Sequence, residues 1–320
     1  MEPVLLIFIF LISLVANLTF AIPFINFLYR NKFYKTKVTS GVDTSKRNPL
    51  YYKHLGETMS KPSSFGAMVI LNILIFLLVF NKLSYGVKYI IIFTLIFLLF
   101  GLVDDYLKYF YYLKTSRWGL TTRSKLFIQL ALVFLSLIFI ANVWWLLLLF
   151  FLILEITFII NSYNITDGLD GFVGSLTLLI LPVLTYFEYR TINDSNLIYF
   201  YAVLFGFFVV FLYFNIKPAR VIFGDVGSMG IGFLLGILTL RYASIPMLIL
   251  YSIFIIEGLS SLIQILSIRL FKRKVFLIAP LHLNFMNRGW EDTKIVQRST
   301  LVQIILCCLS ILAFELNVWK

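Results

Sequence analysis

The sequence predicts an all-α polytopic membrane protein with about ten transmembrane helices. Its 320 residues are 61% hydrophobic and only 13% charged, and the mean hydropathy is +0.95. Soluble domains are about half apolar and about a quarter charged. Apolar runs of about 20 residues, long enough to cross a bilayer as helices, recur along the chain. These observations exclude an ordinary soluble domain, and we expect residues 1–320 to form a single integral-membrane domain.

Ten apolar segments are expected to cross the membrane. They lie at residues 3–29, 64–81, 85–103, 124–141, 143–160, 171–187, 197–214, 227–243, 246–270 and 297–316. The first has no basic region before it and is expected to be a span rather than a cleaved signal peptide. In the segment from residue 227, glycines recur at helical spacing, which predicts close contact with neighbouring helices. These glycines are Gly227, Gly230, Gly232 and Gly236.

Basic residues are distributed unevenly between the two ends of the predicted bundle. The net charge is +12, and 22 of the 27 Lys and Arg residues fall at one end. That end comprises segments 30–63, 104–125, 161–170, 215–226 and 269–298. The positive-inside rule accounts for this charge without a nucleic-acid partner and places the basic end in the cytoplasm. Both termini are therefore expected on the outside.

The segment from Asn161 to Gly171 is the most concentrated polar cluster at this end. It contains Asn164, Asp167, Gly168, Leu169 and Asp170, and it has no Lys or Arg. Asn, Asp and Gly favour a tight turn that directs side chains and N–H groups toward one point. Such a turn would suit a cation, a phosphate or a sugar nucleotide, and the alternative is a solvated loop between helices.

Adjacent carboxylates, Asp104 and Asp105, stand at the end of the third predicted span. Carboxylates at that depth are costly unless they bind a cation or face water. Lys108 follows Asp104 by four residues, so a simple salt bridge within one helix is an alternative. Lys114 and Lys125 follow, and they would suit phosphates or, equally, anionic lipid head groups.

Asp225 and His282 belong to two further clusters at the same end. Asp225 follows a turn that contains Pro218 and Gly224, and it begins the glycine-rich span. It could cap that helix, or it could join the other aspartates in binding Mg²⁺, which prefers carboxylates with water and phosphate. His282 lies in a basic loop, where a substrate contact and a structural role are both open.

Together these clusters supply carboxylates, lysines and a histidine, without a nucleophilic Ser or Cys beside a base. Phosphoryl transfer uses this equipment: a metal, cations that hold phosphates and a carboxylate that orients or deprotonates the nucleophile. The residues therefore predict a Mg²⁺-dependent phosphotransferase that joins a cytosolic nucleotide-linked donor to a lipid phosphate. The alternatives are a transporter that uses the intramembrane acids Glu155 and Glu257, and an inactive paralogue.

The motifs resemble the polyprenyl-phosphate N-acetylhexosamine-1-phosphate transferase superfamily. The resemblance rests on Asp104 to Lys108 with Gly119, Leu120 and Lys125, on Asn161 to Gly171, and on Asn215 to Ser228. Segments Glu257 to Gln264 and Ala279 to Trp290 are most similar to the phospho-N-acetylmuramoyl-pentapeptide transferase family. The resemblance covers about residues 64–316 and is weaker before them.

The resemblance implies a reaction of peptidoglycan biosynthesis in the cytoplasmic membrane of a bacterium. UDP-N-acetylmuramoyl-pentapeptide and undecaprenyl phosphate would give the first lipid-linked precursor and UMP, with the active site facing the cytoplasm. Membrane lipids are further partners, and a homodimer is left open. A related transferase that uses another UDP-N-acetylhexosamine is the alternative.

The family pattern also assigns roles to individual residues. Asp225 would bind Mg²⁺ with Asn161 nearby, and Asp104 or Asp105 would engage or deprotonate the lipid phosphate. Phosphate binding or ordering of the site would fall to Lys108, Lys125, Asn164 and Asp167. Asp170, Gly168 and Leu169 would face the uracil, and His282 would contact substrate.

Two departures from the family pattern concern the donor. The family's three consecutive histidines read His282-Leu283-Asn284, so only the first is present. Ile222 and Phe223 stand where the family has Phe and Met, which displaces by one residue the aromatic ring expected to stack on uracil.

Overall fold

The computed structural model describes residues 3–31, 33, 61–80, 82–115, 120–140, 146–242 and 245–316, and these ranges form helices joined by turns. Nine of the helices in the described ranges are long and apolar enough to cross a membrane. The predicted all-α polytopic class is confirmed. The helices are α1 (Pro3–Arg30), α3 (Ala67–Val79), α4 (Tyr85–Thr115), α5 (Thr122–Ile140), α6 (Leu146–Thr166), α7 (Phe172–Arg190), α8 (Ser195–Asn215), α9 (Gly224–Tyr242), α10 (Ile245–Leu250), α11 (Ser252–Phe271), α12 (Leu281–Asn287) and α13 (Asp292–Glu315).

Each of the ten predicted segments contains a helix, but some boundaries differ. Segment 64–81 yields only the 13-residue α3, and segment 246–270 is divided at Tyr251 into α10 and α11. Helix α4 does not end near residue 103 but continues to Thr115. The prediction ended this span at the first carboxylates, yet neither Gly nor Pro interrupts residues 102–115, so the backbone continues as a helix.

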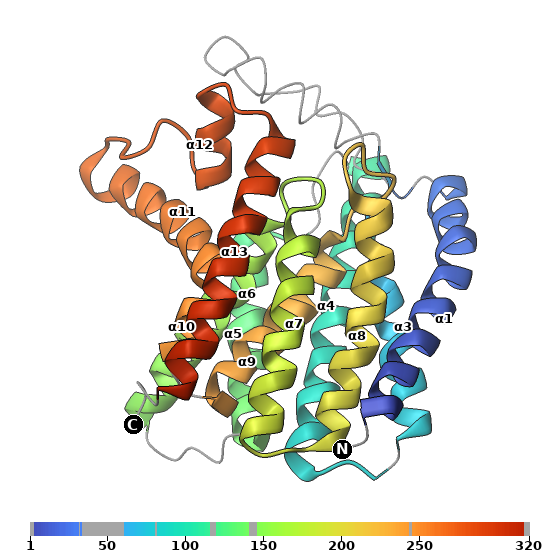
Figure 1. Cartoon of the computed structure of the whole chain (residues 1–320). Coiled ribbons are helices and arrows are strands. Elements are labelled where there is room, and N and C mark those ends of the chain that lie inside the picture. The colour runs from blue at the N-terminus through green and yellow to red at the C-terminus, as the bar shows by residue number, and fades with distance from the viewer. Residues whose placement is uncertain are drawn as a thin grey trace.

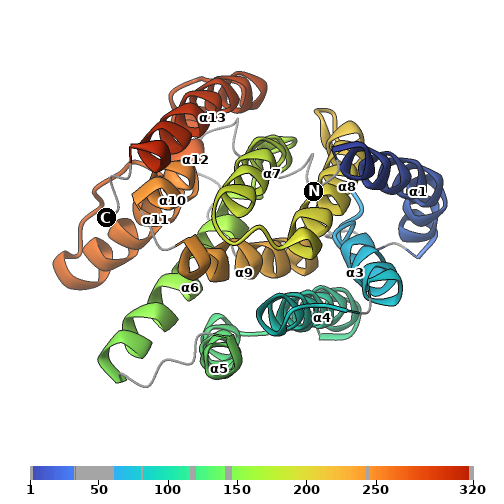
Figure 2. The same cartoon turned by 60° about the horizontal axis from the view of Figure 1, so that its bottom comes forward.

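Helix α9 forms the centre of the bundle. It is the most deeply buried of the spanning helices in the described ranges. Figure 2 shows it crossing the middle of the bundle, with α4 and α5 on one side and α7 and α8 on the other. Figure 1 shows α11 leaning away from the bundle, with α12 above it. The polar groups at the two ends of α9 therefore lie within protein rather than lipid.

The glycines of α9 permit the close packing that their spacing predicts. A Cβ atom added at Gly230 would lie 2.3 Å from Cγ of Leu98 on α4. On the α6 side, a Cβ at Gly232 would lie 3.0 Å from Cα of Ile160. Helix–helix association in lipid depends on such close packing, because apolar side chains gain little by leaving lipid tails.

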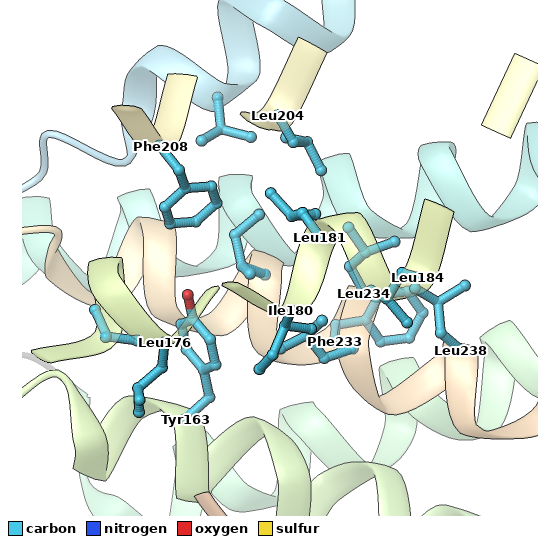
Figure 3. Close-up of a cluster of buried hydrophobic side chains, with 14 of the residues drawn as sticks. Tyr163, Leu176, Ile180, Leu181, Leu184, Leu204, Phe208, Phe233, Leu234 and Leu238 are labelled. Carbon is cyan, nitrogen blue, oxygen red and sulfur yellow. The ribbon is translucent and has the colours of Figure 1, made fainter. Parts of the chain in front are cut away.

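Apolar side chains from α6, α7, α8 and α9 fill the middle of the bundle. Figure 3 shows this cluster, with Tyr163 at its edge. Tyr163, Ile180, Leu204 and Phe233 all have 0% exposure. Beyond the cluster, a buried ion pair joins α7 to the end of α9: Arg241 donates to Glu188 through Nε at 2.6 Å and through a terminal nitrogen at 2.7 Å.

Replacing Gly230 with Ala is expected to lower the stability of the protein in detergent by about 1–3 kcal/mol, because the new methyl group overlaps Cγ and Cδ2 of Leu98. Gly86→Ala is the matched control, since a Cβ at Gly86 on α4 meets no atom within 4 Å. Thermal unfolding of both variants in the same detergent measures the difference. Equal melting temperatures for the two variants would contradict the close contact of α4 with α9.

Candidate functional site

The predicted polar clusters gather at one end of the bundle. Figure 1 shows α12 and the turn that follows α6 at the upper end, where α9 also begins. Helix α1 begins and α13 ends at the lower end. Segments that are far apart in the sequence are thus brought together at the end of the bundle where most basic residues are predicted to lie.

Two lysines and three aspartates form a compact charge cluster where α4, α5 and α9 meet. Lys108 Nζ lies 2.9 Å from Asp104 Oδ2, 3.7 Å from Asp105 Oδ1 and 2.6 Å from Asp225 Oδ2. Lys125 Nζ lies 2.7 Å from Asp104 and also pairs with Asp225. The salt bridge of Lys108 with Asp104 within α4 therefore forms, but it is one part of a larger network. We call these five residues the charge cluster.

Asp105 fixes the start of α9. Its carboxylate accepts hydrogen bonds from the backbone N–H groups of Asp225 and Val226, each at 3.2 Å. Ser64 Oγ donates to the same carboxylate at 2.9 Å. The helix N-terminus has backbone donors without partners in the helix itself, and a carboxylate is a favourable acceptor there. Asp105 from α4 thus supplies the cap of α9, so Asp225 is not needed for that role.

The predicted turn from Asn161 begins later than expected. Helix α6 continues to Thr166, so Asn161 and Asn164 are helical residues rather than turn residues. The prediction included both residues in the turn because Asn, Asp and Gly together favour turns, but packing of α6 against α9 and α11 holds this stretch in a helix. Asn161 Nδ2 donates to Gln129 on α5 at 3.0 Å, and Asn164 Nδ2 donates to Ser228 on α9 at 2.7 Å.

Gln129 links Asn161 to the charge cluster. It lies four residues after Lys125 on α5, and residues at that spacing share one face of a helix. Lys125 contacts Asp225, while Gln129 contacts Asn161. The structure therefore brings the two predicted metal ligands to neighbouring turns of the same α5 face.

The turn from Asp167 to Gly171 is tied to two other parts of the site. Asp170 pairs with Lys61 and accepts a hydrogen bond from the Ala219 N–H at 3.1 Å. The Gly171 N–H donates to Asn215 Oδ1 at 2.8 Å, and Gly171 has a φ of +78°, which favours glycine. Leu169 is only 3% exposed and packs in the core, so its side chain is not available to a ligand.

His282 is held against this turn. Its Nδ1 lies 3.0 Å from Glu257 Oε2, and its backbone N–H donates to the same carboxylate at 3.1 Å. A Cβ added at Gly168 would lie 2.8 Å from His282 Nε2. The absence of a side chain at Gly168 thus allows the imidazole to approach the turn, and the structure brings His282 beside the predicted uracil-facing residues.

Phe223 does not face the site. Its ring is fully buried, with centroids 4.7 Å from Phe211 and 5.7 Å from Phe208. It packs in the aromatic core behind α9, where Gly227 leaves room for it. The displacement of the aromatic residue by one position therefore places its ring in the core, with Ile222 beside it also buried.

The donor atoms suit a magnesium ion only in part. In the described residues, no three His, Cys, Asp or Glu side chains are arranged to hold a metal. Mg²⁺, however, needs only one or two protein carboxylates, with water and substrate phosphate completing the shell. Asp225 has the most accessible side chain of the three aspartates, 15% exposed against 0% for Asp104 and 6% for Asp105. Both hydrogen bonds of Asn161 use its amide nitrogen, so they do not engage its oxygen. These two residues fit such an ion.

Several residues of the site were not predicted as site residues from the sequence: Lys61, Ser64, Gln129, Asn215, Ser228 and Glu257. Lys61 was counted only for its charge, and Gln129 is one amide in an apolar span. A buried polar residue in a spanning helix is itself a signal, because it requires a partner. Gly119 and most of segment 30–63 lie outside the described residues, as does the side chain of Lys114.

The fold defines a polytopic membrane protein with a charged site at one end of its helix bundle. The sequence profile described as Glycosyl transferase family 4 matches residues 87–243, which run from the first turn of α4 to just beyond α9. This stretch contains the whole charge cluster. Its two boundaries lie close to the start of α4 and the end of α9, the helices that carry the aspartates.

Relatives of the chain extend this likeness beyond α9. Phospho-N-acetylmuramoyl-pentapeptide-transferase of Wolbachia sp. subsp. Drosophila simulans is 30% identical over 312 residues, which cover 90% of this chain and 94% of the relative. The protein of the same name from Acetivibrio thermocellus is 28% identical over 330 residues, which cover 97% and 96%. The chain belongs to the phospho-N-acetylmuramoyl-pentapeptide-transferase family.

Lys125→Met is expected to destabilise the protein by about 1–3 kcal/mol, because Asp104 and Asp225 each lose one of their two cations while Lys108 remains. In the double variant Asp104→Asn/Lys125→Met, the loss should be smaller than the sum of the two single losses, because neither partner is left buried and charged. Thermal unfolding of the four proteins in one detergent gives the cycle. Additive losses would contradict direct coupling of Asp104 with Lys125.

Proposed function

We propose that this chain transfers phospho-N-acetylmuramoyl-pentapeptide from its UDP-linked donor to undecaprenyl phosphate, giving the first lipid-linked peptidoglycan precursor and UMP. The charge cluster carries this proposal. Lys108 and Lys125 are two cations that converge on one aspartate, Asp225, at the end of a membrane bundle where a lipid phosphate and a soluble nucleotide can meet. Phosphoryl transfer depends on such positioning and charge neutralisation.

Within this reaction the three aspartates take different roles. Asp105 uses its carboxylate to cap α9, so its role is to hold Asp225 in place. Asp104 is engaged by both lysines and is the aspartate that we assign to the lipid phosphate, as the group that orients or deprotonates it. Lys108 and Lys125 would bind phosphate oxygens of the two substrates.

Asp225, with Asn161 nearby, would hold Mg²⁺. Bound there, the ion would neutralise the pyrophosphate of the donor and stabilise UMP as the leaving group. The chain's own groups would then orient the substrates: Asn164 and Asp167 order the end of α6, while Asp170, Gly168 and Leu169 form the turn expected to bind the uracil. His282 lies against that turn and would contact the donor.

A second candidate is a transferase that uses another UDP-N-acetylhexosamine. Two observations favour considering it. Asn284, at the third position of the family's histidine stretch, is only 5% exposed, and Phe223 is buried in the aromatic core. The segments expected to bind the donor therefore lack two groups that the family resemblance implies.

We also propose an orientation: the charge cluster faces the cytoplasm of a bacterial inner membrane, and both termini are outside. The positive-inside bias supports it. Exposed positions at the two ends, Ile192 and Lys274, allow a direct test in a background where Cys307 and Cys308 are replaced with Ser.

In intact cells, a membrane-impermeant maleimide should label Ile192→Cys, while Lys274→Cys should be labelled only after lysis. The reason is that residue 192 follows α7 at one end and residue 274 follows α11 at the other. Gel shift of the labelled protein measures the outcome. The reverse pattern would overturn the orientation and with it the cytoplasmic site.

Purified protein in detergent should release UMP from UDP-N-acetylmuramoyl-pentapeptide and undecaprenyl phosphate only when Mg²⁺ is present, because the donor phosphates must be neutralised. UMP is measured by chromatography, with UDP-N-acetylglucosamine as a competing donor. Turnover of that second donor alone would select the other transferase. No release from either donor by folded protein would indicate an inactive paralogue, and solute flux in proteoliposomes without UMP would indicate a transporter.

Asp225→Asn should reduce UMP release by at least about a hundredfold, because it removes the charged metal ligand. Asp194→Asn is the matched control, since it makes the same change at the N-cap of α8 and an amide also caps a helix. Both variants should insert and purify as monodisperse proteins. Substantial turnover by Asp225→Asn would remove Asp225 from the metal site.

A further inference from the structure

Helix α11 carries a row of buried polar residues on an otherwise apolar helix. Glu257, Ser260, Gln264 and Ser267 are 4–8% exposed, and they recur every three or four residues, which places them on one helical face. Their apolar neighbours Leu262, Ile263 and Leu266 are exposed. Buried polar groups in a membrane helix need partners, so this polar row indicates a specific contact.

The partner of the polar row is the chain segment that follows α11 and folds back along it. Ser267 Oγ donates to a backbone carbonyl at 2.8 Å, and Gln264 accepts two backbone N–H groups at 3.1 and 2.9 Å. Ser260 Oγ accepts another at 3.0 Å. The backbone groups belong, in this order, to Arg273, Val275, Phe276 and Leu281. The row therefore fixes the path of the chain into α12.

Glu257 is the first residue of the row along the chain, and it contacts His282 in two ways. Its carboxylate accepts the His282 backbone N–H at 3.1 Å, and its Oε2 lies 3.0 Å from the ring Nδ1. Both side chains are buried, at 4% and 2% exposure. A carboxylate has no donor, so Nδ1 must carry the proton in this contact. The backbone bond and the ring bond together leave the imidazole one orientation.

That orientation presents Nε2 to the turn after α6. A Cβ at Gly168 would lie 2.8 Å from Nε2, and the ring edge packs against Phe172 with centroids 6.0 Å apart. The imidazole is thus held from behind by Glu257 and faces the turn expected to bind the donor.

We propose that Glu257 is a positioning residue for His282: its carboxylate fixes the proton on Nδ1 and so sets the chemical state in which Nε2 meets the donor. The consequence for turnover rests on the proposed function, whereas the proton placement does not. With an amide at position 257, an NH₂ group replaces one of the two carboxylate oxygens. That NH₂ group cannot accept the ring or backbone N–H that it would face. The charge and acceptor character of Glu257, rather than its bulk alone, are therefore required.

The proton placement can be measured without substrate. The chain has only two histidines, His54 and His282, so ¹⁵N-histidine labelling gives a spectrum of two imidazoles, and a His54→Asn variant assigns them. Solid-state NMR of the protein in liposomes should show a protonated Nδ1 on His282. Glu257→Gln should move the His282 nitrogen shifts toward those of a ring with an unprotonated Nδ1. Glu155→Gln on α6, the same acid-to-amide change in another helix, should leave them unchanged.

An unprotonated Nδ1 in the wild-type protein would overturn the inference, and so would identical His282 shifts in wild-type and Glu257→Gln. The wild-type spectrum decides the first point even if the variant fails to fold.

Turnover provides the second readout. Glu257→Gln should raise the KM for the UDP-linked donor at least about tenfold and leave the KM for undecaprenyl phosphate unchanged, because His282 faces the donor turn. Equal changes in both constants would indicate a general structural role and contradict the positioning role. If the wild-type protein releases no UMP, the proposed function fails while the NMR result still stands or falls by itself.

Discussion

At the end of the bundle that contains the charge cluster, the arrangement of the helices depends on the neutralisation of buried aspartates. Asp104 is fully buried at one end of the helix bundle, and a charge in that position is strongly destabilising unless cations compensate it. Lys108 comes from the same helix, Lys125 from α5, and Asp225 from the start of α9 joins both lysines. The interactions that stabilise the junction of three helices are thus the same ones that form the site.

Glycine makes this junction sterically feasible. A Cβ at Gly101, one turn before the aspartate pair on α4, would lie 2.3 Å from the backbone oxygen of Asp225. Only this close approach brings Asp105 within reach of the N–H groups that open α9. At the far end of α9, the buried pair of Glu188 with Arg241 provides a second anchor. Helix α9 is therefore fixed at both ends by charge and along its length by close packing.

The sequence predicts the helices and the polar clusters but not how the clusters meet. Ten spans are predicted from hydropathy. Asp104, Asp225 and Asn161 are predicted as site residues because carboxylates and amides at the ends of membrane spans are costly without a partner. The cap of α9 by Asp105 and the pair of Lys61 with Asp170 join residues more than one hundred positions apart. No local pattern encodes such contacts. The predicted turn forms, but it begins at Asp167 rather than at Asn161, because packing of α6 overrides the turn preference of Asn.

The balance of charge in the cluster bears on how anionic substrates could enter it. Three carboxylates face two ammonium groups, which leaves one net negative charge when all five are ionised. A lipid phosphate or a pyrophosphate would be repelled by that balance, and the low dielectric of the site strengthens the repulsion. A divalent cation at Asp225 would reverse the sign and release the lysines to bind phosphate oxygens. In the proposed reaction, the same aspartates that hold α4, α5 and α9 together would therefore create the need for a metal ion.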